Sequence, residues 1–274
     1  MEARQVTVNG IQMRWQESGT GLPVVLIHGI PTCPQLWRHV VPHLHGARAL
    51  AWEMVGYGAS IPEGHGRDIS VGQQAEYLVA WLREIGVERA VLVGHDLGGG
   101  VAQIAAVRHP EFVQGLVLMN SIAYDSWPIP SVKVMRVLSP AVRHLPDAIF
   151  RQVFRLFLLQ GHTTWQQAWE AFGAHWPHYA THGGAAAFIR QVRALDVRDT
   201  LAIADQLSNL NVPARLVWGA ADQFQQIGYG YGLAHDLRAR LDRIEGGKHF
   251  VPEDHPGRVA TAVNDLVAEI PSTR

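Results

Sequence analysis

The sequence predicts an α/β protein that is built on a mostly parallel sheet and carries a block of inserted helices. Three observations support this fold class. Five short apolar runs rich in Val, Leu and Ile recur along the chain, as expected for strands buried on both faces of a sheet. Helical patterns separate most of these runs, and between about residues 125 and 199 the pattern is helical alone. The runs are Val24–Ile27, Ala49–Trp52, Val91–Val93, Leu116–Met119 and Leu216–Trp218.

The individual elements follow in chain order. Val6–Val8 and Met13–Trp15 flank Asn9-Gly10, a pair that favours the positive φ angles of a hairpin turn. Capping and stop signals then bound the helices between the later strands. The expected elements are a helix after the Ser70–Gln73 capping box, a helix over Leu97–His109 that ends before Pro110, a strand and turn over Pro213–Asp222, and a closing helix near Pro252–Ile270.

The helical stretch is rich in aromatic residues. Asp147 opens a helix that carries Phe150, Phe154 and Phe157 and ends near Gly161. The next helix places four aromatic residues on one stripe, Trp165, Trp169, Phe172 and Trp176. We therefore predict a core domain of residues 1–124 and 200–274 and a helical cap of residues 125–199, over the carboxyl ends of the strands, where it can roof an apolar pocket.

Composition excludes several classes of protein. The 274 residues carry a net charge of −1 and are 47% apolar, which argues against a nucleic-acid partner. No apolar run reaches the roughly 18 residues of a membrane span, and the N-terminus lacks a secretory signal pattern. The single cysteine, Cys33, excludes an intramolecular disulfide. We expect a cytoplasmic monomer or homodimer that acts on a small apolar substrate, without a membrane or nucleic-acid partner.

The sharpest motif is Val91-Leu-Val-Gly94-His95-Asp96-Leu97-Gly98-Gly99, in which a strand runs through a tight turn into a helix. Glycines two positions before and after Asp96 match the G-x-Nu-x-G nucleophile elbow, whose small flanking residues let a strained turn present a nucleophile. The nucleophile position holds an aspartate. A dinucleotide-binding G-x-G-x-x-G pattern fails, because it needs glycine where Asp96 stands.

Two partners follow in the order nucleophile, acid, histidine. Asp222 follows an apolar strand, and His249 lies 27 residues later in Gly246-Gly-Lys-His249-Phe. A further loop, His28-Gly29-Ile30-Pro31, follows an early strand and is placed to supply one backbone N–H of an oxyanion hole. The two amides of that hole are expected to be those of Ile30 and Leu97.

With these motifs the chain resembles the α/β-hydrolase superfamily, and within it the aspartate-nucleophile branch of epoxide hydrolases and haloalkane dehalogenases. The resemblance spans nearly the whole chain. It implies the α/β-hydrolase fold, with a mostly parallel eight-stranded sheet flanked by helices and the cap inserted after the sixth strand. It also implies a cofactor-independent hydrolase in which Asp96 forms an alkyl ester that His249, oriented by Asp222, hydrolyses.

The leaving group separates the two activities. Haloalkane dehalogenases bind the halide with a Trp directly after the nucleophile, where this chain has Leu97. Epoxide hydrolases use cap tyrosines as proton donors, for which Tyr124 and Tyr179 are the candidates. We therefore expect an epoxide hydrolase that forms a vicinal diol. The alternatives are a dehalogenase with an atypical halide site and a non-catalytic protein that binds an apolar ligand.

Other residues complete the expectations for the site. His28, Trp37 and Trp127 are predicted to line the substrate pocket. His175, His178 and His182 stand at spacings that could hold a metal ion. Because Pro177 interrupts that helix and no cysteine or acid stands nearby, we predict no metal site and no cofactor.

Overall fold

The computed structural model describes residues 1–270. Its centre is an eight-stranded sheet in the order β1-β2-β4-β3-β5-β6-β7-β8. The β1–β2 and β2–β4 pairs are antiparallel, and every later pair is parallel. The strands are β1 (Glu2–Val8), β2 (Ile11–Ser18), β3 (Leu22–Ile27), β4 (Ala47–Trp52), β5 (Ala90–His95), β6 (Val113–Met119), β7 (Ala214–Gly219) and β8 (Arg240–Ile244).

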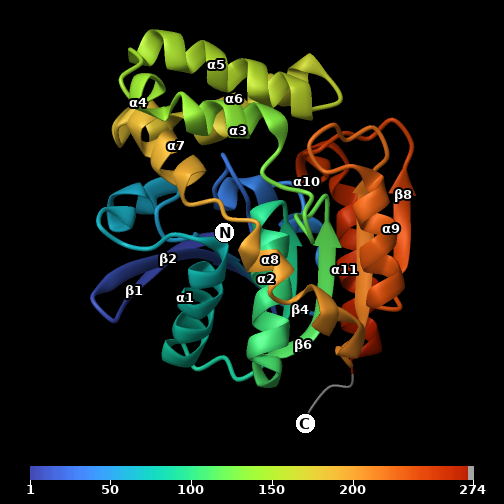
Figure 1. Ribbon diagram of the computed structural model, residues 1–274. Helices are drawn as coiled ribbons and strands as arrows, with labels where there is room; N and C mark the ends of the chain where they lie inside the picture. The colour runs from blue at the N-terminus through green and yellow to red at the C-terminus, as the bar shows by residue number, and fades with distance from the viewer. Residues whose placement is uncertain (271–274) are drawn as a thin grey trace.

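Helices cover the sheet on both sides and at one end (Figure 1). Those that flank it are α1 (Val71–Glu84), α2 (Leu97–Arg108), α9 (Ile227–Asp236) and α11 (Pro256–Glu269). Short helices α8 (Arg198–Leu201) and α10 (Val251–Asp254) lie in connections. Short 3₁₀ turns cover Pro34–Trp37, Val41–His43, Gly58–Gly64, Pro110–Phe112 and Ala204–Asn209.

A helical layer follows β6 and precedes β7. It consists of α3 (Pro130–Val137), α4 (Ser139–Val142), α5 (Asp147–Gly161), α6 (Trp165–Thr181) and α7 (Gly184–Arg193). Figure 1 shows this layer beyond one end of the sheet, with α5 and α6 outermost. The order of elements matches a block of helices inserted after the sixth strand, and the domain boundaries at 125 and 199 stay a prediction.

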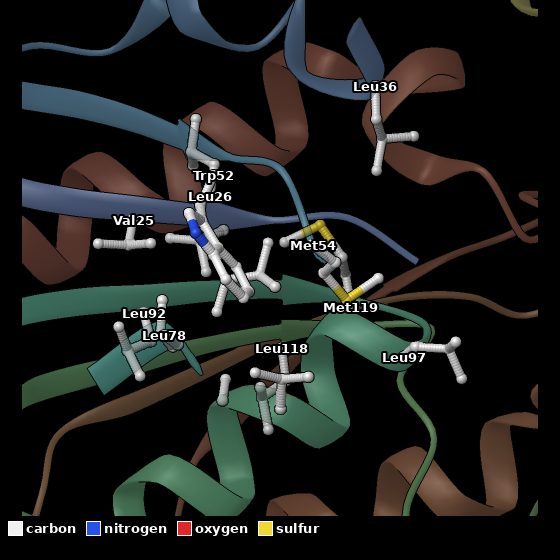
Figure 2. Packing of buried hydrophobic residues seen from close by; sticks show 14 of the residues in the cluster. Val25, Leu26, Leu36, Trp52, Met54, Leu78, Leu92, Leu97, Leu118 and Met119 are labelled. Atoms are coloured by element: carbon white, nitrogen blue, oxygen red, sulfur yellow. The ribbon is translucent and has the colours of Figure 1, made fainter. Parts of the chain in front are cut away.

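The core lies between the sheet and its helices. Side chains of neighbouring parallel strands are fully buried on both faces of the sheet: Leu92 and Leu118 lie on one face and Leu26 on the other (Figure 2). Trp52 packs among them, with its ring 6.1 Å from that of Trp81. This packing fixes the carboxyl ends of β3, β5 and β6, from which the candidate catalytic loops leave the sheet.

The predicted fold class is confirmed, with two differences in detail. The sequence pattern misses β8, because Arg240–Ile244 is a polar edge strand with a single buried side chain. Helix α6 continues through Pro177 to Thr181, so the expectation that Pro177 interrupts it is wrong. A proline removes one N–H from the helix, and the carbonyl that loses its partner is that of exposed Gly173, which water can reach. Among residues 1–270, no helix is long and apolar enough to cross a membrane.

Candidate active site

The turn at Asp96 places its carboxylate at the end of β5. Asp96 has φ 52° and ψ −119°, a conformation that costs energy for a residue with a side chain. The turn closes only because its neighbours are glycines. A Cβ at Gly98 would collide with the Ile27 carbonyl, and one at Gly99 would collide with Ser121. The strained geometry of an elbow is therefore present, with the candidate nucleophile at its tip.

The Ile30 backbone amide holds one oxygen of this carboxylate, donating to Asp96 Oδ2 at 3.0 Å. The Leu97 amide lies close enough to the carboxyl to lower its pKa. Gly29 has no side chain at the point where a Cβ would collide with Oδ2. Burial raises the pKa of Asp96 to about 6, against the opposing effects of His249 and of these two amides.

The candidate base is oriented by a buried acid. His249 Nδ1 lies 2.9 Å from Asp222 Oδ2, and both side chains are almost fully enclosed. Burial lowers the pKa of His249, but the Asp222 and Asp96 carboxylates outweigh it, so the pKa lies above the usual value. The main chain of His249 is also fixed, because its N–H donates to the Gly161 carbonyl at 2.9 Å, at the end of α5. The helical layer thus holds the loop that carries the base.

Asn120 is a further member of this site that the sequence analysis does not identify. Its Nδ2 donates to Asp222 Oδ2 at 2.6 Å, and its Oδ1 accepts from the Gly219 amide at 3.1 Å. The Phe224 amide donates to Asp222 Oδ1 at 2.7 Å. A detectable signal is the position of Asn120 directly after β6, at the same edge of the sheet as Asp96 and Asp222.

A cavity of about 40 Å³ lies over Asp96 and His249. Its walls come from the loop before α3, from α3 and α5, and from the segment after Asp222. Apart from Asp96 and His249, the lining residues are Ile30, Leu97, Ile122, Trp127, Pro128, Ile129, Val132, Phe157, Leu195, Phe224 and Gln225. The space is small and almost entirely apolar.

Comparison with known proteins gives the family. Residues 23–256 match the family model described as alpha/beta hydrolase fold. The chain belongs to the α/β-hydrolase family. Haloalkane dehalogenase 2 of Mycobacterium tuberculosis (strain CDC 1551 / Oshkosh) is 28% identical over 264 residues, which cover 92% of this chain and 90% of that protein.

Two further relatives align with nearly the whole of this chain. The 2-hydroxymuconate semialdehyde hydrolase of Pseudomonas sp. (strain CF600) is 29% identical, over 97% of this chain and 94% of that protein. The crystal structure of an α/β-hydrolase fold protein from Burkholderia ambifaria matches with a TM-score of 0.89 and 26% identity, over 97% of this chain and 98% of that one. These similarities identify the chain as a hydrolase without selecting a substrate.

Only one of the three predicted pocket residues of this hydrolase lines the cavity. Trp127 does so, with its Nε1 donating to Thr200 Oγ1 at 2.7 Å. His28 instead accepts from the Met54 amide at 3.2 Å inside the core. Trp37 is fully buried among core residues. Both are fully buried and lie outside the cavity.

The two candidate proton donors are placed elsewhere as well. Tyr124 donates to Asp236 Oδ2 at 2.6 Å, and Tyr179 is buried and donates to Gln191 Oε1 at 2.7 Å. Neither tyrosine lines the cavity. Chain position alone suggests both residues, but the hydroxyl of each is directed to a neighbouring polar side chain.

Gln225 is the polar wall residue that sequence analysis does not identify. It is 3% exposed and lines the cavity. Its Oε1 is enclosed without a partner, and no residue among 1–270 forms a hydrogen bond with its side-chain amide. This leaves Nε2 as the end that can donate into the cavity. Gln225 stands three residues after Asp222, in a segment whose sequence shows no motif.

His175, one of the three histidines considered for a metal site, contacts a cysteine and an acid that are distant in the sequence, so the expectation that neither stands nearby is wrong for this residue. His175 Nδ1 lies 3.3 Å from Cys33 Sγ, and its Nε2 lies 3.3 Å from Glu253 Oε1. Within the described part of the chain, no three His, Cys, Asp or Glu side chains converge as metal ligands.

Proposed function

We propose that this hydrolase cleaves short apolar haloalkanes through an ester on Asp96. In the first step the Asp96 carboxylate attacks the sp³ carbon, a C–O bond forms, and the carbon–halogen bond breaks to release halide. In the second step water hydrolyses the ester to an alcohol and regenerates Asp96. The reaction consumes one haloalkane and one water, and it yields an alcohol, a halide ion and a proton.

The hydrogen bonds of Asp96 support the first step. Because the Ile30 amide already engages Oδ2, Oδ1 is the oxygen available to attack. An sp³ carbon needs a nucleophile approaching opposite the leaving group, and a carboxylate fixed at the base of a narrow cavity restricts the approach to one direction.

The second step uses the same amides. His249 takes a proton from water as the water attacks the carbonyl carbon of the ester. The negative charge then develops on the oxygen that the Ile30 amide holds, with the Leu97 amide beside the carboxyl proposed as the second donor; each such donor is worth roughly 3 kcal/mol. Asp222, itself held by Asn120, keeps the ring of His249 oriented and stabilises its charged form.

The few polar side chains that line the cavity favour a halide over an alkoxide as the leaving group. Of the residues 1–270 that line it, none is Tyr, Ser or Thr, whereas the amide of Gln225 has no other partner. An alkoxide leaving an epoxide needs a proton, which an amide does not supply. A halide needs only N–H donors. The similarity to a haloalkane dehalogenase supports the same choice.

Epoxide hydrolysis is the second candidate. Leu97 lines the cavity at the position where the resembling dehalogenases carry a halide-binding Trp, so a halide would have a single side-chain donor. The catalytic steps at Asp96 and His249 are the same for both substrates. A non-catalytic ligand-binding protein, the third alternative, gives no reason for Asp96, His249, Asp222 and Asn120 to be assembled.

Paired substrates test the proposal. Purified protein is incubated with 1-bromobutane and with 1,2-epoxybutane, and bromide, butanol and diol are measured. We expect bromide and butanol in equal amounts and little diol. A single turnover in ¹⁸O-labelled water should give unlabelled butanol, because its oxygen comes from Asp96.

Each contrary result has a definite meaning. Diol without bromide would replace the proposal by epoxide hydrolysis. Labelled butanol in the first turnover would remove the ester intermediate. Turnover of neither substrate, together with binding of both, would support the non-catalytic alternative.

A further inference from the structure

The outer surface of the helical layer is unusually apolar. Of the twelve large apolar side chains exposed among residues 1–270, nine lie between 134 and 169. Two of them, Trp165 and Leu156, are 66% and 65% exposed. We define the outer face by its members on α5 and α6, which are Ile149, Val153, Leu156, Leu159, Trp165 and Trp169. Contiguous apolar surface of this kind marks an interaction site.

The outer face also contains a groove. A space of about 220 Å³ lies between α5 and α6, with Leu156, Leu159, Trp165 and Trp169 along it. Arg155 borders the groove, and its guanidinium lies 4.5 Å from the centre of the Trp169 ring. The surface therefore combines exposed indoles with a cation at their edge, as interfacial helices do.

Charge around this face is strongly one-sided. Residues 130–170 contain five of the 23 Lys and Arg but only two of the 24 Asp and Glu. One of those two acids, Glu170, is already paired with Arg38 and His39. The segment is thus positive, whereas the rest of the chain has 18 basic and 22 acidic residues and is negative. Two of these cations, Arg151 and Arg155 on α5, lie over the Phe172 and Trp169 rings and form the basic rim of the apolar outer face.

We propose that the outer face adsorbs to the surface of an anionic lipid bilayer. Trp165, Trp169 and Leu156 would insert among the headgroups, while Arg151 and Arg155 would meet lipid phosphates. A twofold pairing of the same face would bring two basic rims together, with Asp147 the acid left to compensate them. The expectation of no membrane partner rests on the lack of a spanning segment, and adsorption requires none.

The inner side of the same helices supplies a use for this contact. Phe157 on α5 lines the cavity, while Leu156, its neighbour on the same helix, belongs to the outer face. An apolar substrate concentrates in a bilayer. Docking through the outer face would bring the cavity wall close to the substrate dissolved there. This use rests on the proposed function, whereas adsorption itself does not.

Vesicle binding without substrate tests the proposal. The full chain is sedimented with vesicles of phosphatidylcholine alone and with vesicles containing 30% phosphatidylglycerol. We expect binding to the anionic vesicles and a blue shift of Trp emission, since Trp165 and Trp169 are the exposed indoles among the described residues. Arg151→Gln should weaken partitioning about fivefold on anionic vesicles and leave it unchanged on neutral ones.

Matched variants distinguish binding through the outer face from nonspecific adsorption to the vesicles. The double substitution Leu156→Gln and Trp165→Gln should weaken binding at least about tenfold. Leu201→Gln and Arg4→Gln change an exposed leucine and an exposed arginine outside the face, and they should bind like the wild type. Wild-type binding no greater than that of the double variant would overturn the proposal.

A different partner would also be visible. If the wild type elutes as a dimer and Leu156→Gln with Trp165→Gln elutes as a monomer, a second copy covers the face and the proposal fails. Because no turnover is measured, failure of adsorption and failure of haloalkane cleavage are separate results.

Discussion

The floor and the walls of the cavity are built in different ways. Asp96, Asp222 and His249 on the floor are each held by hydrogen bonds to backbone amides, to the Asn120 amide or to one another, with heavy atoms 2.6 to 3.0 Å apart. The walls are mostly apolar side chains such as Trp127 and Phe157, which come from a separate helical layer. The floor determines how a bond is broken, and the walls determine which bond is presented.

This difference orders the effects of mutation. A change on the floor removes a reacting group or its orientation, and no neighbour can replace it. A change in the walls alters shape or a single hydrogen bond, and the chemistry below stays intact. Losses of activity should therefore fall from the floor outward.

Asp96→Asn should give the largest loss, about 10⁴-fold or more in kcat. It should also stabilise the fold. Burial raises the pKa of Asp96 to about 6, so the folded state loses stability as pH rises from about 4 to 6; the full cost is present above pH 6 and none of it below about pH 4. The free energy of unfolding of the asparagine variant is expected to exceed that of the wild type by about 1–3 kcal/mol at pH 8. At pH 4 the two free energies should be nearly equal.

Urea unfolding at the two pH values measures this difference. Equal stability of variant and wild type at pH 8 would show that Asp96 carries no buried charge when folded. Residual turnover above one per cent would show that another group is the nucleophile.

His249→Gln should stop the reaction half-way. Attack by Asp96 does not need the base, so one equivalent of bromide per protein is expected, followed by a halt. Intact mass should rise by one butyl group, and Asp96→Asn treated alike is the blank. In the wild type, hydrolysis should speed up with rising pH as His249 loses its proton, with a midpoint above 6.5 because the pKa of His249 is raised. Continued turnover by the variant would remove His249 as the base.

Asn120→Ala tests a floor residue that acts by holding Asp222 in place. It removes the donor to Asp222 and leaves the Gly219 amide without its acceptor, so we expect kcat to fall about 10–100-fold and stability to fall by about 2 kcal/mol. Gln74→Ala is the control, because it removes a buried side-chain amide that hydrogen-bonds the Val55 backbone and not Asp96, His249 or Asp222. A similar stability loss with full kcat is expected there. If both variants keep full kcat, Asn120 is structural only.

The same contrast explains what the sequence could predict. The elbow at Asp96 depends on glycine spacing and strand order, which are local and visible in the chain, and so the hydrolase fold follows from them. Tyr124 and Tyr179 looked suitable by position, but the partners that hold their hydroxyls, Asp236 and Gln191, stand 112 and 12 residues further on. Gln225 faces the cavity because of packing that no spacing encodes.

Gln225→Leu changes only a wall of the cavity and should lower activity moderately. Removing one N–H donor is expected to lower kcat/KM for 1-bromobutane about 5–30-fold and to change Asp96 ester hydrolysis little. Gln223→Leu, an exposed neighbour bound to Gln160, is the matched control and should keep wild-type activity. If the loss is equal for bromide release and for ester hydrolysis, Gln225 acts on packing and not on the leaving group.

Tyr124→Phe and Tyr179→Phe should have the smallest effects, within about threefold in kcat/KM for either substrate. Each loses one hydrogen bond away from the cavity, to Asp236 or to Gln191, which costs about 1–2 kcal/mol of stability. Activity and thermal unfolding of the two variants distinguish a structural hydroxyl from a proton donor. Loss of diol formation with unchanged bromide release would make that tyrosine the acid for epoxide opening, and it would mean that this part of the wall moves when substrate binds. Unchanged activity with lowered stability places the whole difference between the two substrates on Gln225 and the apolar wall around it.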